Sequence, residues 1–508
     1  MAATTSAPAQ HRPPRVSSAV PRGAARLLSV ELRRNAMPWI LPLIAALFWF
    51  DSYRPSTGTA PLYSLRTFWN MGQGHTIIDF GPFVAGVAAW MGSRDGRRGM
   101  ADLVTATSRP HWAAQLTTWA ATAIWAVAAY LVFVGIMFAM YARQGVGGAP
   151  PWWWVAVGAM AVAAFSAAGF AIGAYWPTRF AAPVAAFGGF LAMVTSSQTG
   201  FSHVNGWAQI LPTNSNGNFG NPLTDAGIFY PWMPDVPIVR IMFLAGLAVA
   251  ALGLTGLPAR AGGRGLRRAA ALIAIAGVAL AGTAVGLTTT ARLGPHGIVI
   301  PALHDAASDK AVTYTPSCDR AAGLPVCLNP AYRRWLPDVR DALAPLLVEL
   351  SGLPGAPVRA SQVAADNASS PPAITFGGHP PALRMSLGQL NLPGQCGFCR
   401  GPVASTQFAD EMRLLTAHAF VGAGAGVGSP VQQAVQAVLL NAAGVPFAAQ
   451  PRAIAAAENL PKPAPGTTGP VYAAARRLDA LPVAARHAWL VAHLAAVRAG
   501  GLTLADLP

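Results

Sequence analysis

The sequence predicts a helical membrane protein in which an all-α bundle of spans is followed by an α+β domain outside the membrane. Charged residues make up only 11% of the 508 residues, and the mean hydropathy is +0.40. Several windows near the length of a bilayer span carry almost no charge, and they all lie before residue 291. The segment 291–508 has the charge and hydrophobicity of a water-soluble fold and holds all 4 cysteines.

The N-terminal segment is expected to stay in the cytoplasm. Residues 1–23 are rich in Ala, Ser, Pro and Arg and lack an apolar run, which predicts a disordered tail. Ala24–Arg34 has the spacing of a short amphipathic helix, with Leu28 and Leu32 one turn apart among arginines. A basic amphipathic helix before a span favours the membrane interface. The alternative is that these arginines only fix the topology.

Seven apolar segments are expected to cross the bilayer. Six belong to a domain at 24–257, and the seventh follows a basic loop within 258–290. The expected spans are Met37–Phe50, His75–Met91, Trp112–Tyr141, Val155–Tyr175, Ala181–Ser196, Pro237–Leu257 and Ala269–Thr289. Three consecutive tryptophans, at 152–154, are typical of an aromatic belt at the membrane boundary.

Arginines determine the expected orientation. They cluster in the tail and at the span ends near 34, 94–109, 179 and 260–268, which all fall on one side of the bilayer. The positive-inside rule places that side in the cytoplasm, so 291–508 is extracytoplasmic. The formal net charge of +16 therefore reflects membrane topology, and we expect no nucleic-acid binding.

The segment Ser93–Pro110, SRDGRRGMADLVTATSRP, connects the second and third spans. It is either a positive-inside loop or a short amphipathic helix around Asp102 that could pass force to a cytoplasmic partner. The pattern, carried by seven residues, resembles the corresponding segment of bacterial ABC-2 type export permeases. The matching residues are Asp95, Gly99, Asp102, Leu103, Thr105, Ser108 and Arg109.

The resemblance covers roughly residues 26–259 and implies a transporter subunit. In the family, this segment is a coupling helix that docks on a separate ATPase, and the permeases act as homodimers or pairs. The expected function is thus an exporter permease of the cell membrane that moves its substrate when the ATPase drives it. The domain 291–508 and the seventh span would be additions to the six-span core.

The outer domain is expected to be α+β and rich in helices toward its end. Expected strands are Ala311–Tyr314, Val358–Val363 and Ile374–Phe376. Tyr332–Leu350 has helical spacing, and Pro345 predicts a kink or break within it. Further helices are expected at Ser405–Phe420, Val431–Ala442 and Pro482–Val497.

The cysteines Cys318, Cys327, Cys396 and Cys399 predict disulfides, since an even number is confined to the extracytoplasmic domain. Of three possible pairings, proximity favours Cys318–Cys327 with Cys396–Cys399. A redox motif at Cys396-Gly-Phe-Cys399 and zinc binding are alternatives, although a strand–helix context and zinc-like spacing are missing.

No sequence motif predicts catalysis. The zinc-protease, nucleophile-elbow and phosphate-loop patterns are absent, and His487 and His493 are not spaced to share a helix face. We expect no enzyme activity, no cofactor and no metal in this chain. We expect the ATPase to be a separate chain. The alternative function is a membrane-anchored enzyme or a sensor with chemistry or recognition in 291–508.

Overall fold

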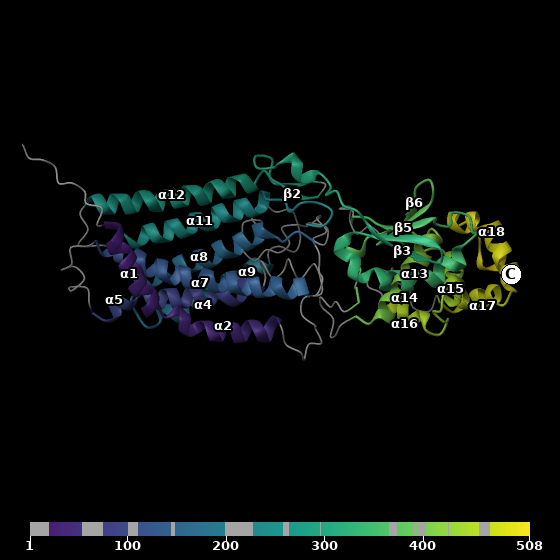
Figure 1. The fold of residues 1–508 in the computed structure, drawn as a ribbon, viewed down its shortest axis with the longest axis horizontal. Coiled ribbons are helices and arrows are strands. Elements are labelled where there is room, and N and C mark those ends of the chain that lie inside the picture. Colours follow the sequence, from purple (N-terminus) through teal and green to yellow (C-terminus); the bar gives the residue numbers. More distant parts are fainter. Residues whose placement is uncertain are drawn as a thin grey trace, which may run out of the picture.

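A computed structural model describes residues 20–52, 75–99, 110–143, 148–198, 227–257, 264–294, 296–364, 373–390, 392–393, 403–424, 426–456 and 468–508. The described chain forms an elongated molecule with a helical bundle at one end and a domain of helices and strands at the other (Figure 1). We call the bundle end that carries α1 and α5 the distal end, and the end that faces the C-terminal domain the junction end.

The bundle contains the apolar helices that the sequence predicts. They are α2 (Met37–Ser52), α4 (His75–Gly92), α7 (His111–Arg143), α8 (Trp152–Tyr175), α9 (Ala181–Gln198), α11 (Asp235–Thr255) and α12 (Arg264–Thr288). Among the described residues, α7, α8, α11 and α12 are long and apolar enough to span a membrane, whereas the apolar parts of α2, α4 and α9 are shorter. The multi-span membrane character is confirmed at this level, and the six-span core remains a prediction.

Two short helices complete the distal end. The predicted interfacial helix is α1 (Val20–Arg34), which begins before the expected Ala24, so that residues 20–23 are helical rather than part of a tail. The segment after α4 forms α5 (Arg94–Arg97), a single turn.

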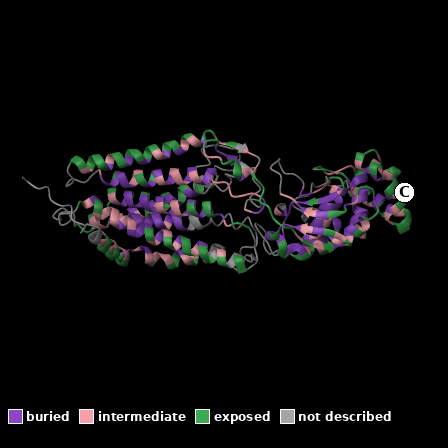
Figure 2. Ribbon diagram, turned by 45° about the horizontal axis from the view of Figure 1, so that its top comes forward, coloured by how far each residue is buried: buried purple, intermediate pink, exposed green. Residues whose placement is uncertain are grey.

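Small residues set how closely the bundle helices approach. A Cβ at Gly169 or Gly173 of α8 would collide with the backbone carbonyls of Ala85 or Ala89 on α4. Gly246 and Gly277 bring α11 and α12 together in the same way. Helices that lack a hydrophobic driving force in lipid gain stability from such close backbone contact. The outer face of α12 is exposed along its length (Figure 2), which is typical of a lipid-facing surface.

A small two-stranded sheet connects the parts. Strands β1 (Arg292–Gly294) and β2 (Gly297–Val299) pair antiparallel directly after α12 and are followed by the 3₁₀ turn η3 (Ala306–Asp309). The strand expected at Ala311–Tyr314 is absent. The Val312 N–H instead donates to the Phe229 carbonyl at 2.7 Å, and the Tyr314 ring meets the Phe229 ring edge to face. The backbone of this segment therefore pairs with the loop before α11 instead of with a strand.

The C-terminal domain contains a five-stranded mixed sheet in the order β3-β4-β5-β7-β6. Strands β5 (Arg359–Gln362) and β6 (Ile374–Gly377) confirm two predictions. The hairpin of β3 (Ser317–Ala321) and β4 (Leu324–Leu328) and the short β7 (Ala382–Met385) were not predicted. Strand β5 is parallel to its neighbours β4 and β7. Each edge strand is antiparallel to its neighbour, β3 to β4 and β6 to β7.

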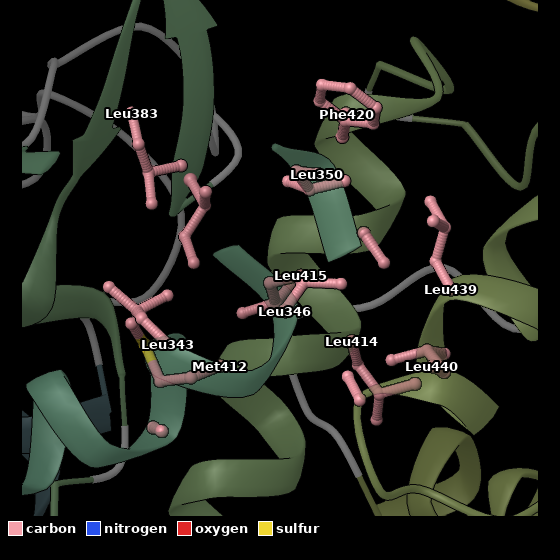
Figure 3. Close-up of a cluster of buried hydrophobic side chains, with 14 of the residues drawn as sticks. Leu343, Leu346, Leu350, Leu383, Met412, Leu414, Leu415, Phe420, Leu439 and Leu440 are labelled. Carbon is pink, nitrogen blue, oxygen red and sulfur yellow. The ribbon is translucent and has the colours of Figure 1, made fainter. Parts of the chain in front are cut away.

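Helices α13 (Leu336–Leu350) and α14 (Ser405–Phe420) pack on this sheet. The 3₁₀ turn η4 (Pro330–Trp335) precedes α13, which continues through Pro345. Of the two expectations for Pro345, the break is therefore wrong and the kink stays a prediction. Leucines of α13, α14 and α15 (Pro430–Ala442) meet in one core (Figure 3). The remaining elements are α16 (Gln450–Ala456), α17 (Thr468–Asp479), α18 (Val483–Ala499), η5 (Leu387–Gln389) and η6 (Leu504–Asp506). The helices predicted at Ser405, Val431 and Pro482 are thereby confirmed.

Candidate functional site

The predicted coupling segment starts at the distal end of the bundle. Asp95 lies in α5, and Gly99 follows it with a φ of +61°, a left-handed conformation that glycine adopts without strain. The other predicted residues, Asp102, Leu103, Thr105, Ser108 and Arg109, lie outside the described residues. The start of the segment therefore shows how it is anchored to the bundle.

Arg94 joins α5 to α1. Two of its guanidinium N–H groups donate to the two carboxylate oxygens of Glu31, each at 3.0 Å. The Arg94 side chain is 21% exposed and the Glu31 side chain is 14% exposed, so the pair is shielded from most of the solvent. Two parallel charge-assisted bonds fix orientation as well as distance. Glu31 thus raises the pKa of Arg94, and α1 and α5 are held as one unit.

Asp95 extends this ion pair toward α7. Its carboxylate lies 3.4 Å from Arg94 Nε and 3.9 Å from Nε2 of His111, the first residue of α7. His111 and, after it, Arg94 hold the pKa of Asp95 below its ordinary value, while burial opposes them. A single turn of chain is therefore connected by charge to both α1 and α7.

Arg97 anchors the same turn to α4. Its guanidinium lies over the Trp90 ring, 3.4 Å from the centroid, and donates to the Trp90 carbonyl at 2.9 Å. Arg97 Nε also donates to Ser93 Oγ at 3.0 Å. A cation stacked on an indole and bonded to backbone has little rotational freedom. Arg97 therefore extends the rigidity of α4 into α5.

The opposite side of α5 rests on the turn between α8 and α9. A Cβ at Gly96 would collide with the Pro177 ring, so glycine permits this close approach. Polar bonds also fix α1 and α2 on α7. The Trp125 indole N–H donates to the Leu32 carbonyl at 3.0 Å, and buried Asn35 donates to Thr122 Oγ1 at 2.9 Å while capping α2. A displacement of α5 would therefore disturb its contacts with α1, α4, α7 and the α8–α9 turn.

Sequence reasoning missed Glu31 and His111. Glu31 is the only acid in the predicted amphipathic helix, where the other charged residues are arginines. A lone carboxylate on a basic interfacial helix needs a cation nearby, which is the signal that could have found it. His111 offers no such signal, because its partner is set by how α4 and α7 meet.

One predicted disulfide is present. Cys318 and Cys327 face each other across β3 and β4 and are bonded. Cys396 and Cys399 lie outside the described residues, so their pairing stays a prediction. The bond joins the two strands of the hairpin at the edge of the sheet, where it has a structural role.

A pocket of about 260 Å³ opens between α14 and α16 in the C-terminal domain. It is lined by Thr406, Gln407, Asp410, Glu411, Ala449, Arg452 and Ala453. Burial raises the pKa of Asp410, against the opposing effect of Arg413 at 3.8 Å. Two carboxylates thus share one small space with a guanidinium.

Within the described residues, no three His, Cys, Asp or Glu side chains are arranged to hold a metal ion. His487 contacts the Ser351 carbonyl, and His493 stacks on Trp489 one turn before it on α18. Both histidines therefore have structural partners. The aromatic-belt residues also divide, since Trp152 is exposed whereas Trp154 is buried beneath Arg240.

No family model matches the chain, and no curated protein and no solved structure matches it either.

Proposed function

We propose that this protein is the membrane subunit of an exporter that a separate ATPase drives, as its resemblance to ABC-2 type permeases implies. The observation that carries the proposal is the bidentate Glu31–Arg94 pair. It fixes an amphipathic helix at the membrane face to the first turn of the segment that would meet the ATPase.

The distal end has the mechanical connections that such a subunit needs. A push on the segment after α5 would act on α1 through Glu31, on α7 through His111 and on α4 through the Arg97–Trp90 stack. ATP-driven closure would favour one arrangement of these helices by binding it more tightly than the other. The N-terminus and α5 would then be cytoplasmic, and the C-terminal domain would be outside.

The first test is purification of the tagged chain in mild detergent, with mass spectrometry of copurifying proteins. An ATP-binding subunit should accompany the normal chain and be lost from a double variant that carries Asp102→Lys and Arg109→Glu. If an intact normal chain brings no ATPase, the proposal fails.

A second test separates contact from force transfer. Glu31→Arg and Arg94→Glu should each retain the ATPase but reduce ATP-driven transport in vesicles, and the double swap should restore part of it. Arg33→Glu, on the exposed face of the same helix, is the matched control for altered charge. Equal loss in all three single variants would show that net charge, rather than the pair, matters.

A second candidate function is recognition of a small ligand by the C-terminal domain. The α14–α16 pocket favours it, because Asp410 and Glu411 suit an ammonium group and Arg452 suits a carboxylate. We infer that a zwitterion such as an amino acid or the end of a peptide would fit. A pool of such ligands should raise the melting temperature of the full chain.

The matched variants are Asp410→Asn in the pocket and Asp338→Asn on α13 outside it. Loss of the ligand effect in the first variant alone would support recognition at the pocket. An equal effect in both variants, or none in the normal chain, would exclude it.

A further inference from the structure

A histidine lies between two carboxylates where the C-terminal domain joins the bundle. His304 Nδ1 is 3.2 Å from Asp235 Oδ2, and His304 Nε2 is 3.0 Å from Asp309 Oδ2. Asp235 begins α11, whereas Asp309 ends η3. The cluster therefore connects an apolar helix of the bundle with the 3₁₀ turn that leads into the C-terminal domain.

Asp235 makes the cluster sensitive to charge. Its side chain is fully buried, and the same oxygen that meets His304 also accepts from the Ile300 N–H at 2.9 Å. The other oxygen, Oδ1, is buried and has no hydrogen-bond partner among the residues that the structure describes. The N-terminus of α11 favours a negative charge here, but a buried carboxylate still needs a cation.

The geometry requires a proton. Ionised carboxylates only accept hydrogen bonds, and a neutral imidazole has one N–H donor. Both ring nitrogens face carboxylate oxygens, so the ring donates from both only as imidazolium. Asp309 and then Asp235 raise the pKa of His304, and burial opposes them only in part.

Other charged groups around the cluster have separate partners or are exposed. Arg240, further along α11, lies over Trp154 on α8, and Asp305 caps the Ala307 N–H of η3. Arg292 on β1 and Lys310 after η3 are exposed. Within the described residues, His304 forms ion pairs with Asp235 and Asp309 only.

We propose that His304 is a proton-binding site that latches the segment 297–309, which leads into the C-terminal domain, to the start of α11 when the ring is charged. Loss of the proton would place a lone pair against a carboxylate and leave Asp235 buried without its cation. The polar contacts between the segment 297–309 and the start of α11 would then weaken, while the packing of Ile298 and Ile300 on the bundle remains. The inference does not depend on transport, and it makes the junction a sensor of the pH on that side.

The sign follows from the direction of the shift. Because the folded pKa of His304 is raised, the latch is at full strength below the ordinary histidine pKa. It is lost as the pH rises through the raised value. Acid on the side of the junction therefore closes the latch, and alkali opens it.

The test is hydrogen–deuterium exchange of the full chain in nanodiscs from pH 5.5 to 9.5, corrected for the intrinsic pH dependence of exchange. In the normal chain, protection of the peptide that contains Ile300 should fall about tenfold across one sigmoidal step. His304→Gln should remove the step and leave protection low throughout. His296→Gln, in the same junction but stacked on Tyr230, should keep the step.

Asp309→Asn gives a second measurement if His304→Gln does not fold. It removes one of the two charges, so the midpoint should move down by about one pH unit. Protection that stays constant with pH in the normal chain, an unchanged step in His304→Gln, or an unmoved midpoint in Asp309→Asn would overturn the proposal.

Discussion

The bundle and the C-terminal domain are packed by different means. In the bundle, the pairs α4–α8 and α11–α12 meet through glycine and alanine, and backbone lies against backbone at Gly173 and Ala89. In the C-terminal domain, large apolar side chains such as Leu346 and Phe420 fill the space between helices and sheet (Figure 3). The reason is that burial of leucine is driven by its removal from water. In lipid that driving force is absent, and helices are held together by close packing and by satisfied polar groups.

The largest expected effect comes from Gly173→Leu in α8, which places a side chain where the Ala89 carbonyl lies. The helices α4 and α8 would have to separate, which costs about 3 kcal/mol because backbone cannot repack around the added atoms. The yield of monodisperse protein in detergent measures it. Gly188→Leu on α9, where a Cβ meets nothing within 4 Å, should be harmless. Equal damage by both would contradict backbone packing in the bundle.

Leu346→Ala in α13 should unfold the C-terminal domain more easily, by about 3 kcal/mol, because it empties a fully buried site. Chemical denaturation of the full chain, followed by the fluorescence of the domain's tryptophans, checks the loss. Val348→Ala on the same helix is the control, since that side chain is 58% exposed and should change little. A small effect at Leu346 would mean that the leucine core is loosely packed.

Reduction of the Cys318–Cys327 bond should lower stability by about 2.5 kcal/mol, the chain-entropy value for a loop with a sequence separation of 9. Melting curves of Cys318→Ser with and without reductant measure it. The normal chain should melt lower in reductant, and the variant should start low. Alkylation of free thiols before reduction would test whether Cys396 and Cys399 form the second predicted bond. An unaffected melting point in reductant would leave the sheet edge independent of the bond.

The smallest expected effect concerns Asp95 at the distal end. Its lowered pKa means that its stabilising charge is present above the ordinary aspartate pKa and is lost as the pH falls through the lowered value. Asp95→Asn should therefore cost up to about 1 kcal/mol at pH 7 and nothing in strong acid. Melting curves between pH 1.5 and 7 would reveal it. A difference that persists at the lowest pH would point to packing instead of charge.

Local pattern was sufficient for the helices but less so for the sheet. Long apolar runs can only be helical in a membrane, so the segments of α7, α8, α11 and α12 could be found without tertiary knowledge. The strands β3, β4 and β7 are at most five residues long, and β4 contains Pro325, so they lack a clear alternating pattern. Pro345 failed as a breaker because the other contacts of α13 outweigh the bond that proline removes.

The sequence by itself determined the apolar helices, the amphipathic helix α1, the favoured Cys318–Cys327 bond and the arginine-rich turn at Ser93. These follow from composition and spacing within a few residues. Only the tertiary structure decided that Glu31 meets Arg94, 63 positions away, and that His304 lies between Asp309 and Asp235, the latter 69 positions away. Charges find distant partners only after the helices have packed, because packing excludes the water that would otherwise solvate them.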